Sequence, residues 1–121
     1  ALVYYMDAKD WINFGKYYKK YFELAVLNDR SYLHINNISW NVVEHVTDTA
    51  VLATAVNTMK YDIERFDGND YPSIDTYANL LYKIGRREEA IQWEEKAVKL
   101  SNNDKSYMET LEKMKNNQPT W

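Results

Sequence analysis

Few residues in this sequence are of the types that perform chemistry. The chain has no cysteine and only two histidines, His34 and His45. On a continuous helix, eleven residues span about 16 Å, which is too far for two ligands of one metal ion. We therefore interpret both histidines as structural or surface residues. The sequence predicts no metal site, no cofactor and no thiol redox centre.

Acidic residues are the next candidates, because paired carboxylates can exchange protons with a substrate. The second half of the chain holds two adjacent pairs, Glu88 with Glu89 and Glu94 with Glu95. Cations alternate with them along the chain, namely Arg86, Arg87, Lys96 and Lys99. This alternation is typical of a neutralised face in solvent, and we interpret both pairs in that way.

No other arrangement of residues suggests a reaction. The segment F-D-G-N-D, residues 66–70, is too short to be a calcium loop. Gly68 and Gly85 do not belong to a glycine-rich loop of the kind that holds phosphate. Serine and threonine occur without a base at a suitable spacing. The sequence therefore predicts a protein that is not an enzyme.

Composition limits the remaining classes of function. The 121 residues suffice for one domain with one core. The net charge of −3 lacks the basic excess of a nucleic-acid-binding protein, so we expect no nucleic acid partner. No apolar stretch approaches the ~18 residues that a membrane span requires, so we expect no membrane insertion. Eleven tyrosines and four tryptophans are interpreted mainly as packing residues.

Apolar residues recur at steps of three and four, which predicts an all-α fold of about six helices. The expected helices cover residues 7–27, 32–46, a stretch after Thr47 and Asp48 that includes 52–63, and then 75–84, 88–100 and 105–115. Residues 1–6 look like the remainder of a further helix. In the first long helix, Asp7 and Asp10 are expected to cap the N-terminus. Its apolar stripe is expected to comprise Trp11, Phe14, Tyr18, Tyr21 and Ala25.

The best-patterned stretch begins after a predicted loop at residues 66–73. There Pro72 is expected to keep Tyr71 extended, and Ser73 to cap the following helix. Gly85 predicts a left-handed turn between two helices. Three small residues would allow helix axes to approach to the short end of the ~8–10 Å range; they are Ala78, Ala90 and Ala97.

An apolar repeat relates the two halves of the chain. A shift of 35 residues places four apolar residues on four others. The aligned pairs are Val42 with Tyr77, Val46 with Leu81, Ala55 with Ala90, and Val56 with Ile91.

Residues 71–104 resemble a tetratricopeptide repeat, a helix–turn–helix unit of about 34 residues. The matching residues are Tyr77 and Ala78 for its Leu-Gly, Leu81 for its Tyr, Gly85 for the turn glycine, Ala90 and Ala97 for the two alanines of its second helix, and Leu100 at its close. The departures are Ile74 in place of Trp, Glu94 in place of the second helix's aromatic residue, and Asn102 in place of Pro.

This resemblance implies a single helical domain over residues 1–121. Its antiparallel hairpins would stack into a short right-handed superhelix. Residues 1–31 would be a truncated first repeat and 32–70 a degenerate one. Residues 71–104 would be the best-formed repeat, and 105–121 a capping helix with a tail.

A narrower resemblance covers roughly residues 33–121. The phrases D-T-Y-A-N-L-L-Y-K-I-G and E-A-I-Q-W-E-E-K-A-V, with the closing P-T-W, are similar to the helical region attached to thioredoxin-like proteins of Bacteroidetes. This resemblance implies an accessory part of a periplasmic or cell-envelope thiol–disulfide protein. Because the chain has no cysteine, no catalytic residue carries over to it.

The tetratricopeptide resemblance also implies where a partner would bind. The first helix of each hairpin lines a concave surface, and its non-packing positions contact a protein or peptide partner, or a neighbouring domain of the same longer chain. Those positions are Trp40, Glu44, Asp48, Asp75, Asn79, Tyr82, Lys83 and Arg86. Asn79 and Tyr82 can hydrogen-bond a peptide main chain, and Lys83 with Arg86 can meet a carboxylate. The acids of this set disfavour an acidic C-terminus as the ligand.

The alternative function is structural. The helices would then mediate dimerisation or the docking of a neighbouring domain without any peptide groove. The side chains available for such a contact are Trp11, Trp93 and Trp121.

Overall fold

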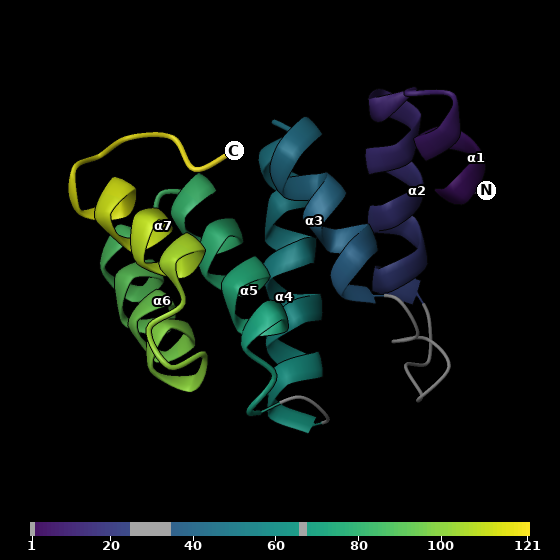
Figure 1. The fold of residues 1–121 in the computed structure, drawn as a ribbon. Coiled ribbons are helices and arrows are strands. Elements are labelled where there is room, and N and C mark those ends of the chain that lie inside the picture. Colours follow the sequence, from purple (N-terminus) through teal and green to yellow (C-terminus); the bar gives the residue numbers. More distant parts are fainter. Residues whose placement is uncertain (1, 25–34, 66–67) are drawn as a thin grey trace.

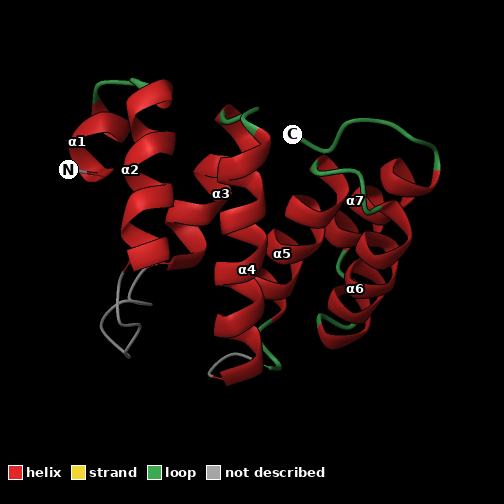
Figure 2. Cartoon of the chain, turned by 180° about the vertical axis from the view of Figure 1, so that it is seen from behind, coloured by secondary structure: helices red, strands yellow, loops and turns green. Residues whose placement is uncertain are grey.

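The computed structural model describes residues 2–24, 35–65 and 68–121, and these residues form helices and turns with no strand among them (Figures 1 and 2). The helices are α1 (Leu2–Asp7), α2 (Trp11–Leu24), α3 (Ile35–His45), α4 (Thr49–Arg65), α5 (Tyr71–Lys83), α6 (Arg87–Leu100) and α7 (Lys105–Lys115). The prediction of an all-α fold with about six helices is confirmed. The predicted bounds of the last helix agree with those of α7.

The helices form a row in which each one contacts helices near it in the chain. In Figure 1 the row runs from α1 and α2 at one end to α6 and α7 at the other. The helix pairs in extensive contact are α1 with α2, α2 with α4, α3 with α4 and α5, α4 with α5, α5 with α6, and α6 with α7. The Tyr77 and Trp93 rings meet at 5.2 Å, each eight residues from Gly85, so α5 and α6 lie antiparallel.

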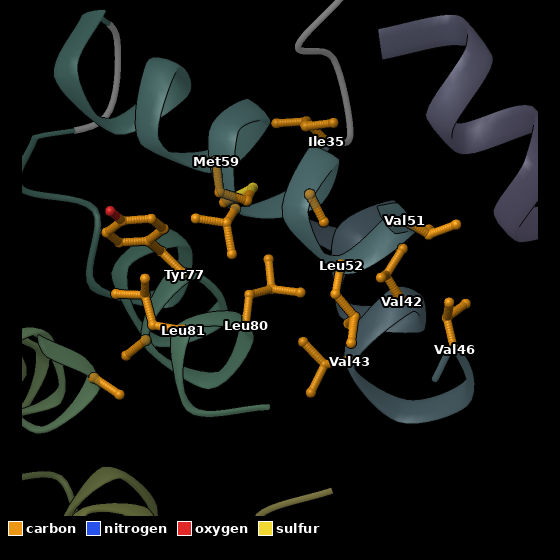
Figure 3. Packing of buried hydrophobic residues seen from close by; sticks show 14 of the residues in the cluster. Ile35, Val42, Val43, Val46, Val51, Leu52, Met59, Tyr77, Leu80 and Leu81 are labelled. Atoms are coloured by element: carbon orange, nitrogen blue, oxygen red, sulfur yellow. The ribbon is translucent and has the colours of Figure 1, made fainter. Parts of the chain in front are cut away.

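The central core joins α3, α4 and α5. Figure 3 shows Met59 and Leu52 of α4 facing Tyr77 and Leu80 of α5. The predicted stripe of α4 is buried throughout; it consists of Leu52, Ala55, Val56, Met59 and Ile63. The three alanines expected at the α5–α6 contact are also fully buried, namely Ala78, Ala90 and Ala97. The apolar periodicity was therefore a reliable guide to this core.

Four of the helix ends share one hydrogen-bonded motif with a left-handed residue. After α5, Gly85 has φ +98°, the Gly85 amide donates to the Tyr82 carbonyl at 3.1 Å, and the Arg86 amide donates to the Leu81 carbonyl at 2.8 Å. This is a Schellman motif, which satisfies carbonyls that the helix leaves open. The same pair of bonds ends α1, α6 and α7, with Lys9, Asn102 and Asn117 at the left-handed position. The predicted role of Gly85 is confirmed.

The expectation of one helix over residues 7–27 is wrong in its first part. Asp7 is the last residue of α1, and the left-handed Lys9 separates α1 from α2. Asp10 does cap α2, because its carboxylate accepts hydrogen bonds from the main chain and the side chain of Asn13. Asp7 and Asp10 therefore lie on either side of a boundary between two helices and do not cap one N-terminus together. Residues 25–27 lie outside the part that the structure describes.

The predicted stripe of α2 is correct at Phe14 and Tyr18, which are fully buried. The prediction is wrong at Tyr21, because the Tyr21 side chain is exposed and Phe22 is buried instead. The helical phase continues as well through position 22 as through position 21, since both lie close to one turn beyond Tyr18. Ala25 is outside the described residues.

The predicted loop at 66–73 is too long. Helix α5 begins at Tyr71, so Tyr71 is helical and not extended, and Pro72 lies in the first turn. Proline is tolerated there because the first amides of a helix have no acceptor within it. The N-cap is Asp70 rather than Ser73; the Ser73 hydroxyl instead donates to the Asp70 carboxylate at 3.1 Å. Residues 66 and 67 are among those not described.

Candidate functional site

Two hydrogen bonds join α3 to α5 at the ends of their contact. The Thr76 hydroxyl donates to the Asn36 side chain, and the Lys83 ammonium donates to the Val43 carbonyl at 2.6 Å. Both bonds link residues 40 positions apart, so the two helices run parallel. Val43 lies in the last turn of α3, where the positive charge of Lys83 also interacts favourably with the negative end of the helix dipole. Partial burial lowers the pKa of Lys83.

Beside this joint, α5 contacts the C-terminal segment, by which we mean residues 118–121. The Tyr82 hydroxyl donates to the main-chain carbonyl of Gln118 at 2.8 Å. The Lys83 ammonium lies 4.9 Å from the centre of the Trp121 ring, a distance typical of a cation–π contact. The Tyr82 and Trp121 rings are 6.1 Å apart. Two of the predicted binding residues thus contact a non-helical stretch of the same chain.

The other predicted residues of the face are dispersed. Trp40 is half-buried against the core, and Glu44 is exposed. Asp48 caps α4, since its carboxylate accepts the Ala50 amide at 2.8 Å. Arg86 is exposed and forms an ion pair with Glu89, with 2.7 Å between nitrogen and oxygen. The structure therefore brings together Tyr82 and Lys83 and leaves the remainder in local roles.

Asn79 lies inside the molecule, and Asp75 is half-buried beside it. Asn79 is fully buried, and its amide nitrogen donates to the Asp75 main-chain carbonyl at 2.7 Å and to the Asp75 carboxylate at 3.1 Å. The carbonyl oxygen of the same amide has no hydrogen-bond partner within the described part of the chain. These two residues consequently form part of the α5–α6 interior.

The interpretation of Glu94 and Glu95 as a pair on a face in solvent is wrong for Glu94. Its side chain is fully buried in α6, whereas Glu95, Lys96 and Lys99 are exposed as expected. The signal was present in the sequence, because Glu94 lies four residues after Ala90 and three before Ala97, within the apolar stripe. It also occupies the position where the tetratricopeptide pattern has an aromatic residue.

The environment of the buried Glu94 carboxyl disfavours its charged form. Among the described residues neither of its oxygens has a donor, and the adjacent acid is Asp75. Burial and the nearby negative charge of Asp75 together raise the pKa of Glu94 to about 11. Burial also raises the pKa of Asp75, although the hydrogen bond that its carboxylate accepts from Asn79 opposes that rise. We call Asp75 and Glu94 the acid pair; burial next to a second acid favours the neutral, protonated form of the Glu94 carboxyl.

Tyr107 of α7 lies close to the acid pair. Burial, with the nearby negative charges of Asp75 and Asp104, raises the pKa of its hydroxyl to about 12. Its ring meets that of Tyr71 edge-on, with 5.6 Å between centroids. The pair is thus surrounded by helix α7 as well as by α5 and α6, and it is a buried structural feature.

A pocket lies elsewhere, between α2 and the turn from α3 to α4. It has a volume of about 170 Å³ and is lined by residues that include Trp11, Lys16, His45 and Asp48. The Trp11 and His45 rings stack there, 3.9 Å apart and 9° from parallel. Pockets for small organic ligands usually measure ~300–1,000 Å³, so this one is small. His34 is not among the described residues.

Comparisons with known proteins add no assignment. No family model matches the sequence, and neither a curated protein nor a solved structure matches it.

Metal-binding clusters and membrane-spanning helices are two further classes of functional feature. Within residues 2–24, 35–65 and 68–121, no three histidine, cysteine or acidic side chains are grouped as metal ligands. In the same part of the chain, no helix has the length and apolar character needed to cross a membrane. Of the predicted binding residues, Tyr82 and Lys83 are the ones that contact residues 118–121, a non-helical stretch distant in the chain.

Proposed function

We propose that this chain is a non-catalytic interaction module built from tetratricopeptide-type hairpins. The support for this architecture is geometric. Helices α3 and α5 run parallel, α5 and α6 form an antiparallel hairpin about a left-handed Gly85, and alanines occupy the close helix contact. Stacked hairpins of this kind present their first helices on one shared surface.

The binding surface is the α3–α5 face, which we define by Val43 of α3 with Tyr82 and Lys83 of α5. The observation that carries the proposal is the bond from Tyr82 to the Gln118 carbonyl. A main-chain carbonyl is present in every extended peptide, so a hydroxyl that reads it can bind a partner of varied sequence. Lys83 adds a cation that can meet an aromatic ring.

The partner is an extended peptide or a neighbouring domain of the same longer protein. From the resemblance to the helical region of thioredoxin-like proteins, we place that protein in the periplasm or cell envelope. A C-x-x-C thioredoxin sequence in the same reading frame would support this context. A reading frame without one would remove it.

The test is selection of unstructured peptides from a displayed library on the immobilised chain. Lys83→Met keeps the length of the side chain but removes its charge and its donors, so the selected peptides should bind about tenfold more weakly to this variant. Lys99→Met is the matched control, because Lys99 is an exposed lysine of α6. Equal loss with both variants, or with neither, would contradict the proposed face.

A structural role remains the second candidate because of the outer surface of α1 and α2. Large side chains are exposed there; they are Tyr4 (69%), Ile12 (75%), Tyr17 and Tyr21. Of the three tryptophans considered for docking, Trp11 and Trp93 are half-buried and Trp121 is more exposed. Light scattering distinguishes the candidates: a dimer that Ile12→Asp dissociates would favour the structural role, and a monomer at all concentrations would oppose dimerisation.

A further inference from the structure

The C-terminal segment leaves α7 and returns across the molecule. The Gln118 amide closes the last turn of α7 by donating to the Lys113 carbonyl at 2.9 Å. Beyond it the chain is not helical, and Figure 1 shows it passing from α7 toward the ends of α5 and α3. It ends on the α3–α5 face, at Tyr82 and Lys83.

The segment contacts this face in the way a bound peptide would. Its first residue offers a main-chain carbonyl to the Tyr82 hydroxyl. Its last, three positions later, offers an aromatic ring to the Lys83 ammonium and the Tyr82 ring. Pro119 lies between them and restricts the segment to extended conformations, which reduces the entropy that binding removes.

These contacts are few, and α7 does not depend on them. Trp121 is 47% exposed although it is the largest side chain of the segment. Helix α7 has its own anchors, since Met114 is fully buried and the Arg87 guanidinium donates to the carbonyls of Met114 and Lys115 at 3.0 and 2.7 Å. The segment can therefore leave the face while the helices keep their arrangement.

We propose that the C-terminal segment is an internal competitor for the α3–α5 face. The partner has the same chemistry as the segment: an extended stretch with an accepting main-chain carbonyl and an aromatic ring three residues further on. This inference rests on the proposed binding function of the face. A tethered segment is present at an effective concentration of millimolar order, so a free partner must displace it.

The test uses a fluorescent peptide with the sequence of residues 116–121, titrated into the unchanged chain and into Trp121→Ala. When the C-terminal segment occupies the face in about 90% of the molecules, the apparent affinity of the unchanged chain for the peptide is about tenfold weaker. Trp121→Ala should therefore bind the peptide about tenfold more tightly. Adding Tyr82→Phe to that variant should weaken binding about fivefold, because the hydrogen bond to the carbonyl is lost. A peptide with alanine in place of its tryptophan should bind at least fivefold more weakly.

Tyr21→Ala is the control for removal of an exposed aromatic ring, since Tyr21 is 48% exposed and lies on α2 at the other end of the row. It should leave the affinity of the peptide unchanged. Circular dichroism verifies folding, and a chain ending at Gln118 replaces Trp121→Ala if that variant does not fold.

The outcomes separate the two proposals. Equal affinity for the unchanged chain and for Trp121→Ala, with loss on Tyr82→Phe, would leave the face as a binding site and overturn the competitor. Binding to neither chain would overturn both the competitor and the face. A concentration-dependent dimer that Trp121→Ala abolishes would show exchange of segments between two copies, and would overturn the intramolecular contact.

Discussion

The two central hairpins place different side chains at corresponding positions. Under the 35-residue shift, Met59 of α4 corresponds to Glu94 of α6, and both are fully buried. In the same way, Trp40 of α3 corresponds to Asp75 of α5. The α3–α4 hairpin thus has apolar residues where the α5–α6 hairpin has the acid pair.

This difference shows that a residue's position around the helix, rather than its polarity, determines whether its side chain is buried. Glu94 points inward because α6 must bury Ala90 and Ala97 on either side of it. Once buried, the carboxyl lowers its cost by keeping a proton and by pairing with Asp75. At the two corresponding positions the α3–α4 hairpin needs no such adjustment, because Trp40 and Met59 do not ionise. The buried acid of this hairpin is Asp62, at a different position on α4.

The largest expected effect comes from placing an acid without a partner at Met59, the apolar position of the α3–α4 hairpin that corresponds to Glu94. Met59→Glu should lower the free energy of unfolding by about 4 kcal/mol, because a carboxyl would be buried without the partner that Glu94 has. Urea denaturation followed by circular dichroism measures this change. Lys60→Glu, at an exposed neighbouring position, should stay within about 0.5 kcal/mol of the unchanged chain. A loss below about 1 kcal/mol for Met59→Glu would show that the two sites are not distinguished by pairing.

The acid pair predicts the next largest effect, a fall in stability as pH rises. The pKa of Glu94 increases from 4.5 in the unfolded chain to about 11 in the folded one, so between these values the folded state holds a proton that the unfolded state has lost. The contribution is complete below pH 4.5 and decreases through this window by at most about 1.4 kcal/mol per pH unit.

Glu94→Gln replaces the carboxyl with an amide, which can donate a hydrogen bond toward Asp75 but does not titrate. It should flatten the pH dependence between pH 5 and pH 8 and, at pH 7, raise the free energy of unfolding by about 1–3 kcal/mol. Glu95→Gln is the matched control on the exposed side of α6 and should change neither quantity. Urea titrations at several pH values measure both. If Glu94→Gln retains the slope of the unchanged chain, the pair does not hold the proton.

The smallest effect sharpens the comparison at the turns. The α5–α6 turn needs a left-handed residue, whereas the capped α3–α4 turn has no residue with positive φ. Gly85→Ala should therefore cost about 1–2 kcal/mol. Gly85→Asn should cost less, because asparagine already occupies this position after α6 and α7. Thermal unfolding compares the two, and Gly68→Ala, where an added Cβ meets nothing closer than 3.7 Å, is the control.

Much of the fold was predictable because local chemistry determines it. The spacing of apolar residues located α4, α6 and α7, and Gly85 marked the end of α5. The errors arose where local chemistry permits two readings. Asp7 and Asp10 suit a capping pair as well as a boundary between helices, and Pro72 suits a loop as well as a first helical turn.

The candidate site was less predictable, because it depends on contacts between distant segments. Tyr82 and Lys83 were identified from their positions on a helix face. Their contact with residues 118–121 requires knowledge of where the chain goes after α7, which no local pattern contains. The acid pair was missed for a different reason, since the alternating charges around Glu94 outweighed its place in an apolar stripe.

The row of helices has a consequence for how the chain folds. Each helix makes its extensive contacts with helices no more than two places away. Proteins rich in such local contacts form quickly, because little loop entropy is lost before a contact is gained. Either end of the row can also detach while the middle holds. Hydrogen exchange should therefore be slowest in α4 and α5 and become faster toward both ends of the chain.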